Sequence, residues 1–261
     1  MYFSAFVFGA IIGSFLNSVL FRKNTGNSPL WGRSRCFSCG KKLSWLELVP
    51  ILSFIIQKRR CGQCGSRISW QYPVVEILIA ILAVLLNFKF STRLPDGQVF
   101  NFQFWFYFTA FCSLFLIAAY DFRHKIIERH FLYIFGGFAV VNTVYRNIQI
   151  STYRYLDILA ALGIFLFFYL LWRVSDGKWM GRGDADLVFF SAIFLGYPLS
   201  LFMLLGSFWI GALFGVVLLI TSFGRITIKS EVPFGPFIAI ALFIAWYFSD
   251  MLTFLYEFIY F

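Results

Sequence analysis

Charged residues are scarce in this sequence. They make up 13% of its 261 residues, whereas a soluble domain carries roughly 25%. Hydrophobic residues make up 60% of the chain, and so much apolar surface is also incompatible with a disordered protein. The composition therefore predicts an all-α, polytopic integral membrane protein with several helical spans.

Long polar segments and several catalytic motifs are also missing. The one sizeable polar stretch covers residues 23–72, so no large soluble domain is expected. The sequence has no G-x-S-x-G, H-E-x-x-H or phosphate-loop motif, and its two histidines, His124 and His130, lack metal-ligand spacing. These absences exclude serine hydrolases of the G-x-S-x-G type, zincins and P-loop enzymes.

The apolar segments predict about eight membrane spans, each needing about 20 residues. They cover approximately residues 3–21, 73–90, 102–120, 130–146, 156–173, 187–204, 206–223 and 233–249. No basic residues precede the first segment and no small-x-small cleavage site follows it, so we interpret it as a retained span rather than a signal peptide.

Two details of the spans stay open at this level. The chain could turn at Gly196-Tyr197-Pro198 or at Gly206-Ser207, so the boundary between the sixth and seventh spans is undecided. The apolar tail, residues 250–261, is either an extension of the last span or an interfacial helix.

The distribution of positive charge predicts the topology. With the N-terminus outside, only four of the 22 Lys and Arg residues lie on the outer side: Lys89, Arg93, Arg146 and Arg154. Because cytoplasmic loops are enriched in Lys and Arg, this bias supports that orientation and explains the net charge of +10 without a nucleic-acid partner. Residues 23–72 then form a cytoplasmic loop. Its apolar stretch, residues 45–56, is predicted to be a helix lying against the membrane or packed on the spans.

The cytoplasmic loop contains two cysteine pairs, C-F-S-C-G at residues 36–40 and C-G-Q-C-G at residues 61–65. Each pair places two thiolates on one tight turn, and the glycine permits the backbone to curl. Two disulfides are disfavoured in a reducing compartment, whereas four thiolates suit a tetrahedral zinc ion. The sequence therefore predicts a closed structural zinc site. Its ligands are Cys36, Cys39, Cys61 and Cys64; the fifth cysteine, Cys112, is predicted to be a core residue.

Two aspartates stand at the predicted cytoplasmic ends of spans. Asp121 ends the third span, and Asp184 opens the sixth after Gly181-Arg182-Gly183. Two carboxylates that face each other cannot both ionise, so one could activate a water while the other protonates or polarises a peptide carbonyl. Gly181 and Gly183 would let a substrate strand approach closely. On charge alone, ordinary headgroup-level carboxylates are the alternative, and we interpret Asp176, Asp186 and Glu128 in that way.

Taken together and in order, these motifs resemble the type IV prepilin peptidases, also called leader peptidase/N-methyltransferases, which are membrane aspartic proteases of the GxGD class. The resemblance covers nearly the whole chain. It rests on G-S-F-L-N at residues 13–17, the two cysteine turns, S-W-Q-Y-P at residues 69–73 with Glu76, then Asp121, G-R-G-D at residues 181–184 and P-F-G-P-F at residues 233–237.

The resemblance implies an endopeptidase of the bacterial inner membrane that removes the basic leader from prepilin or pseudopilin precursors at the cytoplasmic face. Asp121 and Asp184 would act on a water. Many members then methylate the new N-terminus with S-adenosylmethionine, but no donor site carries over residue by residue. The resemblance also implies three parts: a first span at residues 1–22, the zinc-binding loop at 23–72 and the peptidase domain at 73–261. The partners are prepilins and the lipid bilayer, and the sequence indicates no oligomeric state.

Two positions depart from the family pattern. Glu128 follows Ile127 where the family usually has proline, and Asp186 stands where lysine is common. A carboxylate at position 186 could attract the basic leader, which makes Asp186 a candidate substrate contact. Pairing with Arg182 or Lys178 is the alternative.

Other functions are weighed against this one. A peptidase without methyltransferase activity, and a non-enzymatic assembly scaffold that docks through the zinc loop, are both compatible with the residues. An ion-coupled transporter would need carboxylates in mid-membrane and internal repeats, whereas these aspartates lie at span ends and the sequence has no repeat.

Overall fold

The computed structural model describes residues 2–23, 32, 34–91, 101–150, 155–221 and 232–260. Within these residues the regular structure is helical, apart from two isolated β-bridges in the cysteine-bearing loop. The chain divides into two compact units, Met1–Cys112 and Ser113–Phe261. The predicted all-helical fold is confirmed. The predictions on Arg93 and Arg154 lie outside the described residues.

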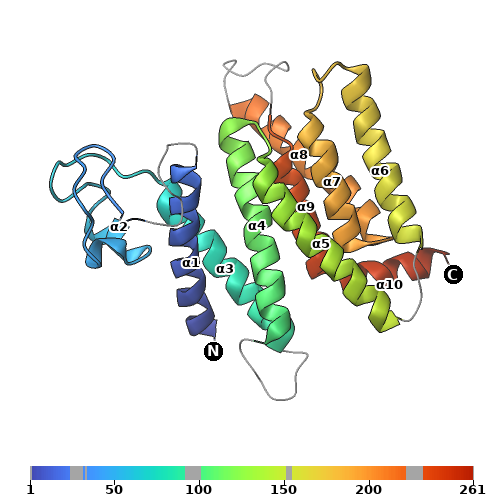
Figure 1. The fold of residues 1–261 in the computed structure, drawn as a ribbon, viewed down its shortest axis with the longest axis horizontal. Helices are drawn as coiled ribbons and strands as arrows, with labels where there is room; N and C mark the ends of the chain where they lie inside the picture. The colour runs from blue at the N-terminus through green and yellow to red at the C-terminus, as the bar shows by residue number, and fades with distance from the viewer. Residues whose placement is uncertain are drawn as a thin grey trace. The chain divides into compact units, whose positions relative to one another are not determined.

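The first unit is built on α1 (Tyr2–Arg22) and α3 (Gln71–Ser91), which pack along each other (Figure 1). Two glycines of α1 allow this close approach. A Cβ on Gly9 would lie 2.6 Å from Cα of Ala80, and one on Gly13 would lie 2.7 Å from Cα of Glu76. Small residues spaced by four let helix backbones touch, so Gly13, the glycine of the 13–17 motif, is needed for packing.

The apolar stretch of the cysteine-bearing loop is not one helix. It forms a 3₁₀ turn, η1 (Leu46–Leu48), and a short helix, α2 (Leu52–Ile56). Pro50 lies between them and holds Val49 in an extended conformation, with ψ of 117°. Because proline also lacks the amide that a helix needs, the single predicted helix is broken there.

The second unit is a helical bundle with α7 (Arg182–Leu195) at its centre (Figure 1). Helix α7 packs against four neighbours: α5 (Arg129–Ile150), α6 (Tyr155–Val174), α8 (Leu199–Thr221) and α9 (Gly235–Tyr247). The division between the two units falls within α4 (Phe102–His124), and α10 (Ser249–Tyr260) follows α9.

Fewer helices meet the requirements of a membrane span than the eight predicted. In the described part of the chain, five helices are long and apolar enough, α1, α3, α4, α6 and α8, or six if α9 and α10 count as one bent span. Helix α7 has 14 residues, which at 1.5 Å per residue is well short of about 30 Å of hydrocarbon. Helix α5 is continuous, but polar residues such as Asn142 and Arg146 interrupt its run of apolar residues.

The structure bears on both details that the sequence left open, the turn between the sixth and seventh predicted spans and the course of the tail. The predicted bounds of the sixth span, residues 187–204, are wrong, because α7 ends at Leu195. Gly196 turns the chain there at φ of 73°, a conformation that favours glycine. Helix α8 then continues without a break through Gly206 and Ser207. The tail is no straight extension of the last span, since α10 makes an angle of 77° with α9.

Candidate active site and four-cysteine cluster

Asp121 lies in the last turn of α4, and its side chain is 4% exposed. Its Oδ2 accepts a hydrogen bond of 3.0 Å from the backbone amide of Gly235, the first residue of α9. A Cβ on Gly235 would lie 2.7 Å from that same oxygen. A side chain at position 235 would therefore displace the carboxylate of Asp121 or the start of α9.

Asp184 lies in the first turn of α7, where it is 9% exposed. Its Oδ2 accepts a 3.1 Å hydrogen bond from the amide of Gly181, the residue that caps the helix. A Cβ on Gly183 would lie 2.9 Å from Cβ of Ile127, so this glycine admits the segment that follows Asp121. Both glycines of the G-R-G-D motif thus contribute to holding the aspartate in place.

The two carboxylates have matching surroundings. Each is buried and accepts the amide of a glycine at a helix N-terminus, where the helix dipole favours negative charge. Asp121 is also close enough to act on Asp184 electrostatically. Among the described residues, no lysine or arginine forms an ion pair with either. Two such like charges favour a state in which one proton serves both.

The other acidic residues of this region are more exposed. Asp176 is exposed, and Glu128 pairs with the His130 ring at 2.7 Å. Asp186 is half-buried, and in the described structure it makes no ion pair with Arg182 or Lys178. The Arg182 guanidinium lies instead over the ring of Trp172, 5.9 Å from its centre.

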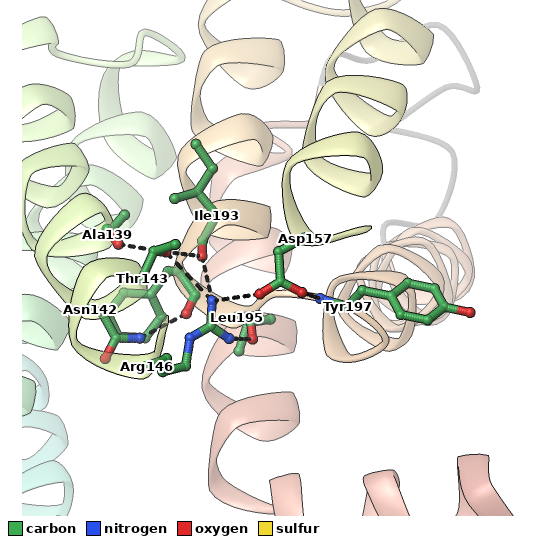
Figure 2. A network of polar contacts seen from close by, with 9 residues as sticks. Ala139, Asn142, Thr143, Arg146, Asp157, Ile193, Leu195 and Tyr197 are labelled. Carbon is green, nitrogen blue, oxygen red and sulfur yellow. Dashed lines mark hydrogen bonds and ion pairs between the residues drawn. The ribbon is translucent and has the colours of Figure 1, made fainter. Parts of the chain in front are cut away.

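The far end of α7 is held by side chains of α5 (Figure 2). The carbonyls in the last turn of a helix lack helical partners, and here they accept hydrogen bonds from α5. The bonds join Thr143 to Ile193, Asn142 to Phe194, and Arg146 to both Ile193 and Leu195. Helix α7 is therefore fixed at the end opposite Asp184.

Arg146 is also part of a buried ion pair. Its Nη2 lies 3.4 Å from Oδ2 of Asp157, which is 4% exposed, and Oδ1 of Asp157 accepts the amide of Tyr197 at 2.9 Å. Sequence reasoning treated Arg146 only as an outer cation and overlooked Asp157. A cation and a carboxylate within apolar segments were the available signal, since such residues usually have partners.

The four predicted cysteine ligands come together. Their Sγ atoms all lie within 4.8 Å of one another, and those of Cys36 and Cys64 are 3.9 Å apart. Tetrahedral zinc with bonds of about 2.3 Å places sulfurs about 3.8 Å apart, so the cluster between the first two long helices could hold such an ion. Cys112 is buried in α4, away from the cluster, as predicted for a core residue.

The two cysteine turns have the same local structure. The amide of Gly40 donates to the carbonyl of Cys36, and the amide of Gly65 donates to the carbonyl of Cys61, both at 2.9 Å. These two glycines have φ of 71° and 70°, and a Cβ on either would meet nothing within 4 Å. They are needed for backbone conformation and not for space.

The surroundings of the cluster shift the pKa values of its thiols in opposite directions. Although the hydrogen bond from the backbone of Lys41 lowers it, the pKa of Cys39 is raised to about 11 by burial and by the neighbouring thiols. Amides of Cys39 and Ser38 and the hydroxyl of Ser66 lower the pKa of Cys36 to about 6. The same hydroxyl and the backbone of Ser66 lower the pKa of Cys64. Because the thiolate is the form that binds metal, Cys36 and Cys64 are the two ligands whose surroundings favour binding of an ion.

Two stretches of the chain match known protein families. Residues 7–90 match the Bacterial Peptidase A24 N-terminal domain, and residues 108–216 match the Type IV leader peptidase family. No solved structure matches the chain.

Three similar proteins bear the name prepilin leader peptidase/N-methyltransferase. That of Bacillus subtilis is 32% identical, covering 94% of this chain and 93% of its own. That of Myxococcus xanthus is 31% identical, covering 87% of this chain and 65% of its own. That of Aeromonas salmonicida is 27% identical, covering 97% of this chain and 93% of its own.

Proposed function

Because this chain belongs to the type IV prepilin leader peptidase/N-methyltransferase family, we propose that it removes the basic leader from prepilin or pseudopilin precursors, with Asp121 and Asp184 as the catalytic pair. One observation carries the proposal: both carboxylates are buried, hydrogen-bonded to helix N-termini and, among the described residues, without an ion-pairing cation. Buried charges that serve only structure are normally paired, so an unpaired couple points to catalysis.

In the proposed reaction, the ionised carboxylate accepts a proton from a water whose oxygen attacks the carbonyl carbon of the scissile peptide. The protonated carboxyl donates a hydrogen bond to the carbonyl oxygen, which takes up the negative charge. The C–N bond then breaks, and the departing amine receives a proton from the pair. Because the amides of Gly235 and Gly181 occupy Oδ2 of Asp121 and Asp184, the Oδ1 atoms are left for water and substrate.

We place this site at the cytoplasmic face of the bacterial inner membrane, in a multi-pass chain with its N-terminus outside. The Asp121–Gly235 bond supports this topology, since it joins the end of α4 to the start of α9. Both ends are cytoplasmic when the positive-inside rule is applied. Residues 1–22, 23–72 and 73–261 are the proposed first span, zinc-binding loop and peptidase domain.

We extend the proposal to methylation of the new N-terminus. Bound S-adenosylmethionine would supply a methyl group carried on a positively charged sulfur. The experiment incubates the purified protein with a prepilin, with and without S-adenosylmethionine, and measures the mass of the product. It distinguishes a bifunctional enzyme from a peptidase alone and from a scaffold. We expect loss of the leader in both samples and one added methyl group in the second. Loss of the leader alone identifies a peptidase without methyltransferase activity, and an unchanged prepilin identifies a scaffold.

Zinc is the proposed ion of the four-cysteine cluster, and it would hold the loop without entering catalysis because four thiolates leave no open position. Replacing Cys36 or Cys61 by serine is expected to remove the zinc and to speed proteolysis of the loop, while the spans stay protected by their own backbone hydrogen bonds. Elemental analysis and limited proteolysis measure both effects. Cys112→Ala is the control and should keep its zinc. Wild-type protein purified without chelator and found free of zinc would refute the assignment.

Asp186 is the proposed contact for the cations of the leader. We expect Asp186→Lys to weaken binding of the substrate, seen as a higher KM, without removing catalysis, because a repulsive charge replaces an attractive one two residues from Asp184. Cleavage rate is measured against substrate concentration for leaders of decreasing positive charge. Asp250→Lys, with an exposed carboxylate at the start of α10, is the control. If Asp186→Lys and the parent depend equally on leader charge, Asp186 is no substrate contact.

A further inference from the structure

The buried ion pair of Arg146 and Asp157 lies at the end of α7 opposite Asp184. Figure 2 shows the pair among the side chains that meet there. Asp184 and Leu195, the last residue of α7, are about 17 Å apart along the helix axis at 1.5 Å per residue. The pair is therefore too distant to contact the scissile peptide or its water, and any effect on cleavage must pass through the helix.

Helix α7 ends where a membrane-spanning helix would continue. Its 14 residues cover about 21 Å, so in the proposed topology its last carbonyls lie within the hydrocarbon layer of about 30 Å. Unpaired carbonyls are costly at that depth. The Arg146 guanidinium by itself pairs two of them, donating to Ile193 at 3.1 Å and to Leu195. The early end of α7 thus depends on Arg146.

The guanidinium fits because the turn after α7 has no side chain. A Cβ on Gly196 would lie 2.7 Å from Oδ2 of Asp157 and closer still to Nη1 of Arg146. The amide of Tyr197 donates to the other oxygen of Asp157 at 2.9 Å. Arg146 of α5 and Asp157 of α6 therefore hold both the end of α7 and the turn that follows it. Because an arginine fork has a fixed geometry, α7 cannot slide along its axis without breaking these bonds.

At the other end of α7, the hydrogen bond of the carboxylate is local. Asp184 accepts the amide of Gly181, three residues earlier in the chain, so this bond moves with the helix. Asp121 is bonded instead to Gly235 of α9. The separation of the two carboxylates therefore depends on where α7 lies along its axis.

We propose that Arg146 and Asp157 are positioning residues for cleavage: they fix the axial position of α7 and so hold Asp184 at the separation from Asp121 that a shared proton requires. The inference rests on the proposed function and adds two residues to it. A buried ion pair contributes little net stability but can select one arrangement of the helices around it. A helix is a rigid element, so a displacement at one end reaches the other.

A stabilising pair and a positioning pair respond differently when both partners are made neutral. Loss of one partner leaves a buried charge alone, which destabilises strongly, whereas neutralising both often costs little stability. In the double variant Arg146→Met, Asp157→Asn, the side chains of Asn142 and Thr143 still donate to Phe194 and Ile193. The protein should therefore fold. The carbonyl of Leu195 loses the Arg146 donor, so the end of α7 is loosened.

Prepilin cleavage by the purified double variant tests the proposal. We expect kcat to fall about 10²-fold, the cost of a displacement of about 1 Å near reacting groups, with KM and detergent-extracted yield unchanged. The pH range over which kcat stays high should also narrow, because proton sharing weakens as carboxylates separate. A smaller amount of folded enzyme would instead lower the rate equally at every pH. Arg173→Lys, with an exposed cation in the last turn of α6, is the control and should match the parent.

Arg146→Lys guards against misfolding of the double variant. Lysine keeps the charge beside Asp157 but not the fork that reaches two carbonyls, so we expect a loss of about tenfold in kcat and the same narrowing. A parental rate in either folded variant, or a lower rate with an unchanged pH profile, would show that the pair only stabilises the fold and would overturn the inference. If Asp121→Asn and Asp184→Asn abolish cleavage while Arg146→Lys does not alter it, the proposed function stands without this inference.

Discussion

Prepilin cleavage is expected to fall at least about 10³-fold when either Asp121 or Asp184 is replaced by asparagine. A positioned acid or base contributes roughly 10²–10⁴-fold, and a cooperating pair loses nearly its whole effect with one member. Asparagine has the same shape, and its amide oxygen still accepts the hydrogen bonds from the amides of Gly235 and Gly181. The variants should therefore remain folded. Cleavage by the purified proteins is the measurement.

The control for this pair is Asp176→Asn, which alters an exposed carboxylate just after α6. It should cleave at the parental rate. Metal content and detergent-extracted yield should be unchanged in all three variants, which separates lost chemistry from lost structure. Near-normal cleavage by folded Asp121→Asn or Asp184→Asn would remove that residue from the proposed mechanism.

A single methyl group at Gly235 is expected to lower cleavage by about 10²-fold. The added Cβ of Gly235→Ala would lie 2.7 Å from Oδ2 of Asp121, so the carboxylate or the start of α9 must move. Displacements of about 1 Å near reacting groups cost about this much. We expect the loss in kcat, because the change moves a catalytic group and leaves substrate contacts in place.

Gly215→Ala is the matched control for this substitution. It lies within α8, where a Cβ would meet nothing within 4 Å, and alanine favours helix. It should therefore cleave at the parental rate. If Gly235→Ala also cleaves at the parental rate, contact between the α9 N-terminus and Asp121 is not needed for activity.

Features that depend on residues close together in the chain could be predicted from the sequence. Each cysteine turn is fixed within six residues by its own hydrogen bonds and a glycine of positive φ, so spacing alone indicated a cluster. Long runs of apolar residues predicted the helices, because a single segment that crosses a membrane satisfies its backbone hydrogen bonds by forming a helix. The catalytic and substrate roles of Asp121, Asp184 and Asp186 stay predictions.

Features that depend on contacts between distant segments could not be predicted from the sequence. The contact of Asp121 with Gly235 spans 114 residues, and no local pattern reveals which amide a carboxylate will meet. The same is true of Arg146, whose partners on α6 and α7 appear only when the bundle forms. The short length of α7 was missed because hydropathy continues across Gly196, where backbone conformation and not polarity ends the helix.

The central claim is that Asp121 and Asp184 work as one unit, and a double-mutant cycle measures this directly. Cleavage rates of one prepilin are compared for the wild type, Asp121→Asn, Asp184→Asn and the variant carrying both changes. Because either substitution alone should disable the pair, we expect the double variant to be little slower than the single ones. Losses that multiply in the double variant, or a single variant that retains substantial activity, would contradict a shared catalytic pair.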